Sequence, residues 1–253
     1  MTPSLSLVRS WVQGYFNGHD NTVAREICAQ GYTLSIGDTV FAGRDNAWLP
    51  AVDVQMRDYP GLSMTVHETL TGEDWTAVWF SEHGERDGVS AAWSGVSIYT
   101  RVGDVLTRCI AQEDYFTRRR QLKSGKPDRI DPAALAPWDV TAGNANAEAE
   151  AVVADWLTGG WPKRGVRCDD EHLTGKTVTF DVTVTDVIEM HSVGDTVVFA
   201  ARQSGRYLGG LPGAIPGPDF IDVNGFVHVR DGRVASGRVI RDRMGLRARR
   251  RRL

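Results

Sequence analysis

The chain has 253 residues, of which 42% are hydrophobic and 24% are charged, and its formal net charge is −3. This length allows one large domain or two of ordinary size, and the composition is that of a globular protein with a sizeable core. The small net charge argues against nucleic acid or a membrane surface as a partner, and no apolar run approaches the roughly 18 residues of a membrane span.

The three cysteines, Cys28, Cys109 and Cys168, are scattered and form no CxxC pair. They indicate reduced core thiols in a cytoplasmic protein rather than a disulfide framework or a zinc site. The first twelve residues contain no long apolar stretch, so no signal peptide is expected.

The first half of the chain predicts helices followed by a meander of strands. Apolar residues recur at helical spacing in Leu5–Asn17, and two further helices are expected at Val23–Ala29 and Arg44–Met56. Alternating runs separated by turn residues then predict four strands, at Met64–Leu70, Trp75–His83, Val89–Thr100 and Val105–Asp114. Helices followed by antiparallel strands indicate an α+β fold.

The second half repeats this order after a proline-containing linker at residues 123–147. A helix is predicted at Asn144–Leu157, Thr196–Ala201 resembles Trp75–Phe80, and both halves end in an aspartate followed by arginines, at Asp114 and Asp242. This is a two-copy internal repeat, which predicts domains at residues 1–122 and 148–253.

The second copy is expected to be degenerate. It is shorter between its first tryptophan and its first hairpin, by about a helix and a loop, and it carries a Gly- and Pro-rich insertion at Gly209–Asn224. Its last seven residues, Arg247–Leu253, contain five arginines and predict a solvated, disordered tail rather than a nucleic-acid contact.

Short motifs in both copies resemble the SnoaL-like branch of the nuclear transport factor two-like superfamily. The second copy has Gly209-Gly210-Leu211-Pro212, Asp231-Gly232-Arg233-Val234 and Asp242-Arg243-Met244-Gly245-Leu246, and the first has Gly103-Asp104-Val105 and Gln112-Glu113-Asp114-Tyr115-Phe116. The resemblance implies two tandem cone-shaped domains, each a curved and mostly antiparallel sheet wrapped around N-terminal helices, with the second copy truncated.

The resemblance also implies a cavity in each cone and a cofactor-independent acid/base chemistry. Members include polyketide cyclases, isomerases, dehydratases and epoxide hydrolases, but many others only bind ligands or partners, so the fold does not fix the function. A hydrophobic, oxygenated, ring-containing molecule is the expected ligand, without a cofactor or a metal. A homodimer is left open.

Asp114 is the leading candidate for the proton-transferring group, because it matches the position of the acid/base aspartate in SnoaL-type cyclases. A carboxyl that faces an apolar cavity is desolvated, which raises its pKa toward working pH. Strand alternation places Asp114 on one face with Arg108, Ile110 and Gln112, the face expected to line the cavity. The alternative is a strand-end carboxylate that caps the following turn.

Three further residues are candidates for catalysis. Asp242 is the matching aspartate of the second copy, although a surface ion pair is the simpler interpretation. Tyr15 on the first helix could hold a developing oxyanion, or else it is a core aromatic residue. His83 could shuttle a proton, although a surface turn position suits it better.

A pocket lining is predicted from aromatic and polar residues on the strands, namely Trp79, Trp93, Ser97, Tyr99 and Gln112. Large aromatic side chains suit flat ring substrates, although ordinary core packing would use the same residues. The leading hypothesis is therefore a cyclase, dehydratase or isomerase without a cofactor. The alternatives are a non-catalytic binding protein of the same fold, and an epoxide or lactone hydrolase that uses water activated by an aspartate.

Overall fold

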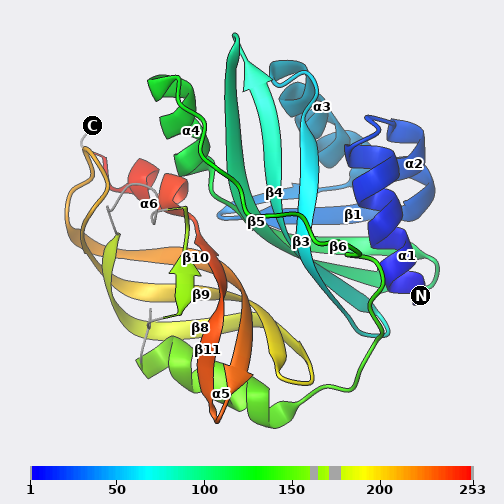
Figure 1. The fold of residues 1–253 in the computed structure, drawn as a ribbon. Coiled ribbons are helices and arrows are strands. Elements are labelled where there is room, and N and C mark those ends of the chain that lie inside the picture. Colours follow the sequence, from blue (N-terminus) through cyan, green and yellow to red (C-terminus); the bar gives the residue numbers. More distant parts are fainter. Residues whose placement is uncertain (1, 160–164, 171–177, 252–253) are drawn as a thin grey trace.

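The computed structural model describes residues 2–159, 165–170 and 178–251, which form two sheets with helices on their outer sides (Figure 1). The first sheet has six strands in the order β2-β1-β6-β5-β4-β3, and the second has five in the order β7-β11-β10-β9-β8. Both sheets are antiparallel except for one parallel pair in each, β1 with β6 and β7 with β11. The predicted tandem α+β fold is confirmed.

The first domain places its helices before and between its first strands. Its elements, in chain order, are α1 (Pro3–Ser10), the π-helical η1 (Trp11–Phe16), α2 (Asn21–Ile27), β1 (Cys28–Ile36), β2 (Thr39–Ala42), the π-helical η2 (Arg44–Trp48), α3 (Leu49–Asp58), β3 (Ser63–Thr71), β4 (Trp75–Arg86), β5 (Val89–Val102), β6 (Val105–Glu113) and α4 (Tyr115–Ser124). Thr2 and Asp20 accept capping hydrogen bonds at the starts of α1 and α2, as short polar N-cap residues do.

The second domain has fewer wall elements. It consists of α5 (Ala147–Gly159), β7 (Val166–Cys168), β8 (Thr179–Val193), β9 (Thr196–Gly209), β10 (Gly217–Arg230), β11 (Arg233–Arg241) and α6 (Arg243–Arg249). Among the described residues, only β7 lies between α5 and β8, where the first domain has three helical segments (α2, η2 and α3) and the β1–β2 hairpin. Residues 125–146, between α4 and α5, contain no helix or strand.

The two sheets pack back to back (Figure 1). Ala77, Val96, Ile98 and Ile110 of the first sheet form one buried apolar cluster with Val198, Ala200, Phe226 and Ile240 of the second. Asn224 locks the two sheets together, because its amide nitrogen donates to the backbone oxygens of Val96 at 3.1 Å and Ile110 at 3.2 Å. The N-terminal helices of each domain consequently cover the other face of its sheet, the face turned away from the neighbouring sheet, which we call the inner face of the domain.

Two expectations for the second half are wrong. The second half of Gly209–Asn224 is not an insertion, because β10 begins at Gly217 and pairs with β9 from Gly217 to His228. The basic C-terminal segment is not a loose tail up to Arg251. Residues Arg243–Arg249 form α6, where Arg249 donates to Asp219 at 2.8 Å, and the side chain of Arg250 donates to the backbone oxygens of Ile215 and Pro216.

No helix in the part of the chain described here has the length and apolar character needed to cross a membrane.

Candidate functional site

A cavity of about 340 Å³ lies on the inner face of the first sheet. Its walls come from helices and strands of the first domain and are mostly apolar: Trp11, Phe16, Leu34, Phe41, Trp48, Val52, Met64, Phe80 and Ala111. The two π-helical segments matter here, since η1 carries Trp11 and Phe16 and η2 carries Trp48. π-helical turns often occur at functional sites, where they redirect side chains. A cavity of this size suits a small ring-containing ligand.

Two glutamates, Glu82 and Glu113, enter this cavity from the sheet. Glu82 lies on β4 opposite Trp93 of β5, and Glu113 ends β6 opposite Gly95 of β5. The side chains therefore approach each other across one intervening strand, where they share a hydrogen bond. Only 2% of Glu82 is exposed, and Glu113 is partly buried.

Burial raises the pKa of both carboxyls. The pKa of Glu82 is raised well above its ordinary value, first by desolvation and then by the charge of Glu113. The pKa of Glu113 is raised less, because Trp93, Arg118, Tyr115 and Glu82 all favour its ionised form against desolvation. Two adjacent carboxyls cannot both ionise cheaply, and the raised pKa of each favours retention of a proton by the pair.

Hydrogen bonds fix the position of this pair. The indole Nε1 of Trp93 donates to Glu113 Oε2 at 2.9 Å, and Gln55 Nε2 donates to Glu82 Oε2 at 3.2 Å. The guanidinium of Arg118 lies 5.0 Å from the ring centre of Trp93 and 4.2 Å from that of Tyr115. One protonated and one ionised carboxyl, held rigidly beside an apolar cavity, can together donate and accept protons.

Further donors lie around the cavity. In the described part of the chain, the buried Nε1 atoms of Trp11 and Trp48 have no hydrogen-bond partner, although both residues line the cavity. Such orphan donors are costly to bury, and a ligand oxygen would satisfy them. Tyr15, expected to hold an oxyanion, lies one layer behind, with its ring centre 5.5 Å from that of Trp11 and 5.1 Å from that of Trp48. Its hydroxyl is buried, and burial raises its pKa.

The second domain completes the cavity. Asp242, Met244 and Gly245, at the start of α6, join the lining. Asp242 caps this helix by accepting from the Gly245 backbone nitrogen at 2.8 Å, and its carboxylate packs against Gly37. Gly37 has φ +53°, and a side chain at this position would collide with Asp242. Desolvation raises the pKa of Asp242. The expected surface ion pair is thus replaced by a capping residue at the cavity rim.

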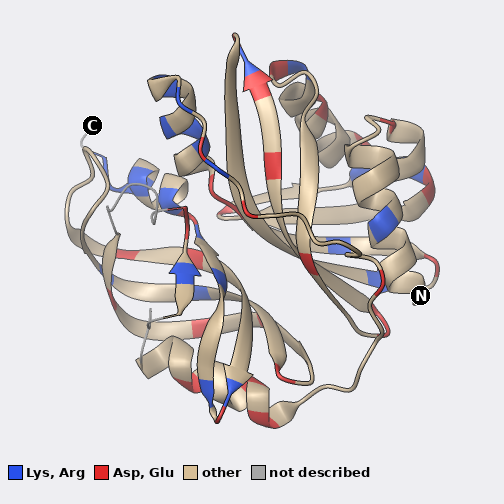
Figure 2. Cartoon of the chain, in the orientation of Figure 1, with Lys and Arg blue, Asp and Glu red and all other residues tan. Residues whose placement is uncertain are grey.

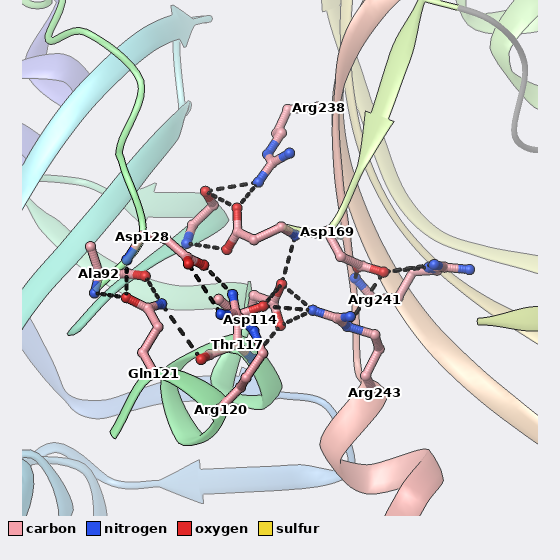
Figure 3. Close-up of polar contacts among 12 residues, drawn as sticks. Ala92, Asp114, Thr117, Arg120, Gln121, Asp128, Asp169, Arg238, Arg241 and Arg243 are labelled. Atoms are coloured by element: carbon pink, nitrogen blue, oxygen red, sulfur yellow. Dashed lines mark hydrogen bonds and ion pairs between the residues drawn. The ribbon is translucent and has the colours of Figure 1, made fainter. Parts of the chain in front are cut away.

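The role expected for Asp114 is contradicted by its surroundings. Its side chain is 1% exposed but lies outside the cavity lining. It caps α4 by accepting from the Thr117 backbone nitrogen at 3.1 Å, accepts from the Asp170 backbone nitrogen at 2.8 Å, and pairs with Arg243 of the second domain (Figure 3). Although burial acts in the other direction, the charge of Arg243 and these hydrogen bonds lower its pKa to about 2. Asp114 is therefore an ionised residue of the domain interface.

The expected cavity face of β6 is wrong by one residue for Arg108 and Ile110, whereas Gln112, near the end of the strand, does line the cavity. Ile110 packs between the sheets, and Arg108 pairs with Glu189 of the second domain at 2.7 Å. Cys109, Ala111 and Glu113, on the opposite face, line the cavity. Strand alternation explains the error, since a shift of one residue exchanges the two faces.

The predicted pocket residues divide into two groups. Ser97, Tyr99 and Gln112 lie in the cavity wall, and their part in ligand binding stays a prediction. Trp93 lies behind Glu113 and bonds to it. Trp79 instead packs against the cluster between the sheets, with Arg167 of the second domain 5.5 Å above its ring, so its expected place in the pocket is corrected.

His83 also lies away from the cavity. Its Nε2 is 2.9 Å from Thr65 Oγ1, and the residue lines a shallow surface depression with Pro60 and Gly61. Burial lowers its pKa. Its neighbour Glu82 faces the cavity instead, because adjacent strand residues point to opposite faces. The sequence did contain a signal for Glu82 as a cavity residue, since Val78, Phe80 and Glu82 share one face of the strand and the acid follows two apolar residues.

The second copy lacks the same pair. The registers match: Glu82 pairs with Trp93 and Glu113 with Gly95, while Gln203 pairs with Ile221 and Arg241 with Val223. Gln203 and Arg241 therefore stand where the first copy has its glutamates. Gln203 donates to the Leu157 backbone oxygen, and Arg241 pairs with buried Asp169 at 2.7 Å. Among the described residues of the second copy, these two positions therefore hold no pair of carboxyls.

Solved structures similar to this chain match about half of it. IdmH from Streptomyces antibioticus, described as a polyketide cyclase, has a TM-score of 0.43 and 19% identity over 49% of this chain and 99% of its own. A structure from Jannaschia, described as a SnoaL-like polyketide cyclase, has a TM-score of 0.45 and 15% identity over 48% of this chain and 92% of its own.

A third similar structure comes from Catenulispora acidiphila. It has a ketosteroid isomerase-like fold, a TM-score of 0.43 and 16% identity over 52% of this chain and 100% of its own. No family model matches the chain, and no curated protein is similar to it in sequence. The similarities concern the fold alone, and they name the fold families that the sequence motifs resemble.

Proposed function

We propose that the first domain is a cofactor-independent acid/base enzyme that acts on a small, hydrophobic, oxygenated ring compound, with Glu82 and Glu113 as its proton-transferring pair. The single observation that carries this proposal is the hydrogen-bonded pair of buried carboxyls beside an apolar cavity of about 340 Å³. An enzymatic or ligand-binding role is the general role that such a fold supports.

The asymmetry of the pair assigns the two roles. Glu113, which accepts from Trp93 Nε1, is the ionised base and takes a proton from the carbon next to a substrate carbonyl. Glu82, which holds the shared proton, donates a hydrogen bond to the oxygen that gains negative charge. The indole donors of Trp11 and Trp48 are further candidates for this oxygen. Isomerisation, dehydration and aldol-type cyclisation all begin with this step.

The geometry also accommodates the hydrolase alternative. The same pair could protonate an epoxide oxygen from Glu82 while Glu113 activates a water molecule. The specific observation in its favour is that two acids lie side by side near the guanidinium of Arg118. The remaining alternative is a non-catalytic protein that binds a small molecule in the same cavity.

Proton abstraction can be tested without knowing the natural substrate. 2-Tetralone and cyclohexanone would be incubated with the protein in D₂O, and deuterium incorporation next to the carbonyl would be followed by NMR. We expect wild-type protein to accelerate exchange and Glu113→Gln to reduce the enzymatic rate by roughly 10²- to 10⁴-fold, the usual contribution of a general base. Exposed Glu85 on β4, the strand that carries Glu82, offers the control Glu85→Gln, which should leave the rate unchanged.

The outcomes separate the candidate functions. Ketone binding that is saturable in wild type, with no exchange above the Glu113→Gln level, would contradict enzymatic proton abstraction and favour the binding protein. Hydrolysis of cyclohexene oxide that depends on both glutamates, without ketone exchange, would favour the hydrolase.

A further inference from the structure

A second concave site, separate from the Glu82–Glu113 cavity, lies between α4 and α6. We name it the α4–α6 groove. It has a volume of about 580 Å³ and is lined by Phe116, Thr117, Arg119, Arg120, Lys123, Ser124, Gly210, Pro212, Arg243, Arg247 and Arg251. Figure 2 shows the basic residues of α4 and α6 gathered at the same end of the molecule.

The groove carries a strong excess of positive charge. Six of its lining residues are Arg or Lys, and no Asp or Glu belongs to its described lining. Two of the six are neutralised, Arg120 by Asp128 and Arg243 by Asp114. The other four, Arg119, Lys123, Arg247 and Arg251, have no acidic partner within residues 2–159, 165–170 and 178–251.

Three of the four cations, Arg119, Arg247 and Arg251, repel one another. Partial burial and the charges of Arg251 and Arg119 lower the pKa of Arg247, which shows that its charge is held unfavourably. Arg247 Nε donates to the Pro212 backbone oxygen at 3.0 Å, but this neutral acceptor does not cancel the charge of the guanidinium. An anion in the groove would remove this repulsion, and arginine binds phosphate oxygens in a bidentate geometry.

The shape of the groove selects the size and kind of anion. A volume of about 580 Å³ suits a small molecule rather than a long polymer segment. The ring of Phe116 forms an apolar wall, with the guanidinium of Arg243 4.9 Å above its centre and that of Arg247 at 5.9 Å. We propose that the α4–α6 groove binds a small phosphorylated molecule through a diphosphate group held by Arg119, Lys123, Arg247 and Arg251.

The proposal does not depend on the chemistry of the cavity. None of the four proposed ligand-binding residues lines the Glu82–Glu113 cavity, so the two sites can be tested separately. Helix α6 contacts both sites. Its N-cap Asp242 and its residue Met244 line the cavity, whereas Arg243 and Arg247 line the groove.

The test is calorimetric titration of the full chain with inorganic pyrophosphate at low ionic strength. We expect saturable binding with one site, and each of Arg119→Gln, Lys123→Gln, Arg247→Gln and Arg251→Gln should weaken it roughly five- to tenfold, as loss of one charge-assisted contact does. The binding should weaken as salt is added, because partly exposed charges are screened. Exposed Arg57→Gln and Arg233→Gln are the matched controls, because neither residue lines the groove.

Three results would overturn the proposal. The first is no pyrophosphate binding at low salt. The second is binding that the two controls weaken as much as the four groove variants, which indicates unspecific charge attraction. The third comes from a short DNA duplex as a second probe: duplex binding that needs the four residues and that pyrophosphate does not displace would assign the groove to nucleic acid. Thermal unfolding of every variant verifies that the chain stays folded.

Discussion

Asp114 and Arg243 lie 129 residues apart in the chain and form a buried ion pair between the two domains (Figure 3). Both residues lie at the start of a helix: Asp114 is the N-cap of α4, and Arg243 is the first residue of α6. Arg243 also contacts Thr117 Oγ1 at 2.9 Å. This pair fixes α6 against the first domain and thereby positions the part of α6 that closes the cavity.

The first prediction concerns the stability that depends on Asp114. Its folded pKa of about 2 lies below the ordinary 3.8, so its stabilising contribution is fully present above about pH 4 and is lost as the pH falls toward 2. Asp114→Asn should lower the free energy of unfolding at pH 7 by about 2 kcal/mol, the equivalent of such a shift. Arg243→Ala should cost more, about 3–5 kcal/mol, because Asp114 is left as a buried unpaired charge. Urea unfolding at pH 7 measures both.

The pH dependence of Asp114→Asn distinguishes this structural role from the catalytic one first expected. The variant should lose stability less steeply than wild type between pH 4 and pH 2. A variant that is as stable as wild type at pH 7 but inactive would restore Asp114 to catalysis.

The second prediction concerns the two glutamates, whose contribution to stability changes with pH in the opposite direction to that of Asp114. The folded-state pKa of Glu82 is raised, so the native protein keeps a proton that the unfolded chain releases, and stability falls as the pH rises above the ordinary value of 4.5 toward the folded pKa. Glu82→Gln should therefore be more stable than wild type at pH 7 and less sensitive to pH between 5 and 7. Melting temperatures across this range check the sign, and a Glu82→Gln protein that melts below wild type at pH 7 would refute it.

The third prediction concerns the contribution of α6 to ligand selection. Met244 joins the cavity lining from the second domain and is only partly buried. Met244→Trp should reduce the space at the rim and raise KM for 2-tetralone more than for the smaller cyclohexanone, with little change in kcat. Met244→Ala should widen the rim and lower KM for 2-tetralone more than for cyclohexanone. Competition assays measure this selectivity. Equal effects on both ketones would show that α6 does not contact the ligand.

The fourth prediction separates the two copies. Asp169 is fully buried and receives the side chain of Arg241, the residue that occupies the position of Glu113. Arg241→Met should destabilise the protein by about 3–5 kcal/mol, because the buried carboxylate of Asp169 loses its nearer cation and keeps Arg243 only at 3.5 Å, yet leave ketone exchange per folded molecule unchanged. Activity measured against the folded fraction tests this, and a loss of kcat in fully folded protein would assign a catalytic part to the second copy.

The sequence predicted the fold better than the site, for a physical reason. The repeat, the helix-then-strand order and the turn residues are local signals, and they lead directly to two α+β domains. The position of a carboxyl relative to a cavity depends on which face of a strand is turned inward, and Glu113 and Asp114 differ by one residue. The apolar row ending in Glu82 was readable, but its partner lies on a strand that is not adjacent, which only the sheet order reveals.

The interface explains why the outer face of β6 was mistaken for the cavity face. Arg108 and Ile110 lie on the face of β6 that contacts a second sheet, where Arg108 pairs with Glu189 and Ile110 joins the cluster between the sheets. Nothing in a single copy of the repeat shows that its sheet is covered on both sides. The same packing accounts for Trp79, which contacts the second domain rather than a ligand.

The protonation state of the glutamate pair is the central claim, and difference infrared spectroscopy measures it directly. At pH 7, wild type compared with Glu82→Gln and Glu113→Gln should show the carbonyl band of one protonated carboxylic acid in wild type, and that band should be absent from Glu82→Gln. The Glu85→Gln protein should keep it. A wild-type spectrum with both glutamates ionised at pH 7 would contradict the shared proton and the enzyme built on it.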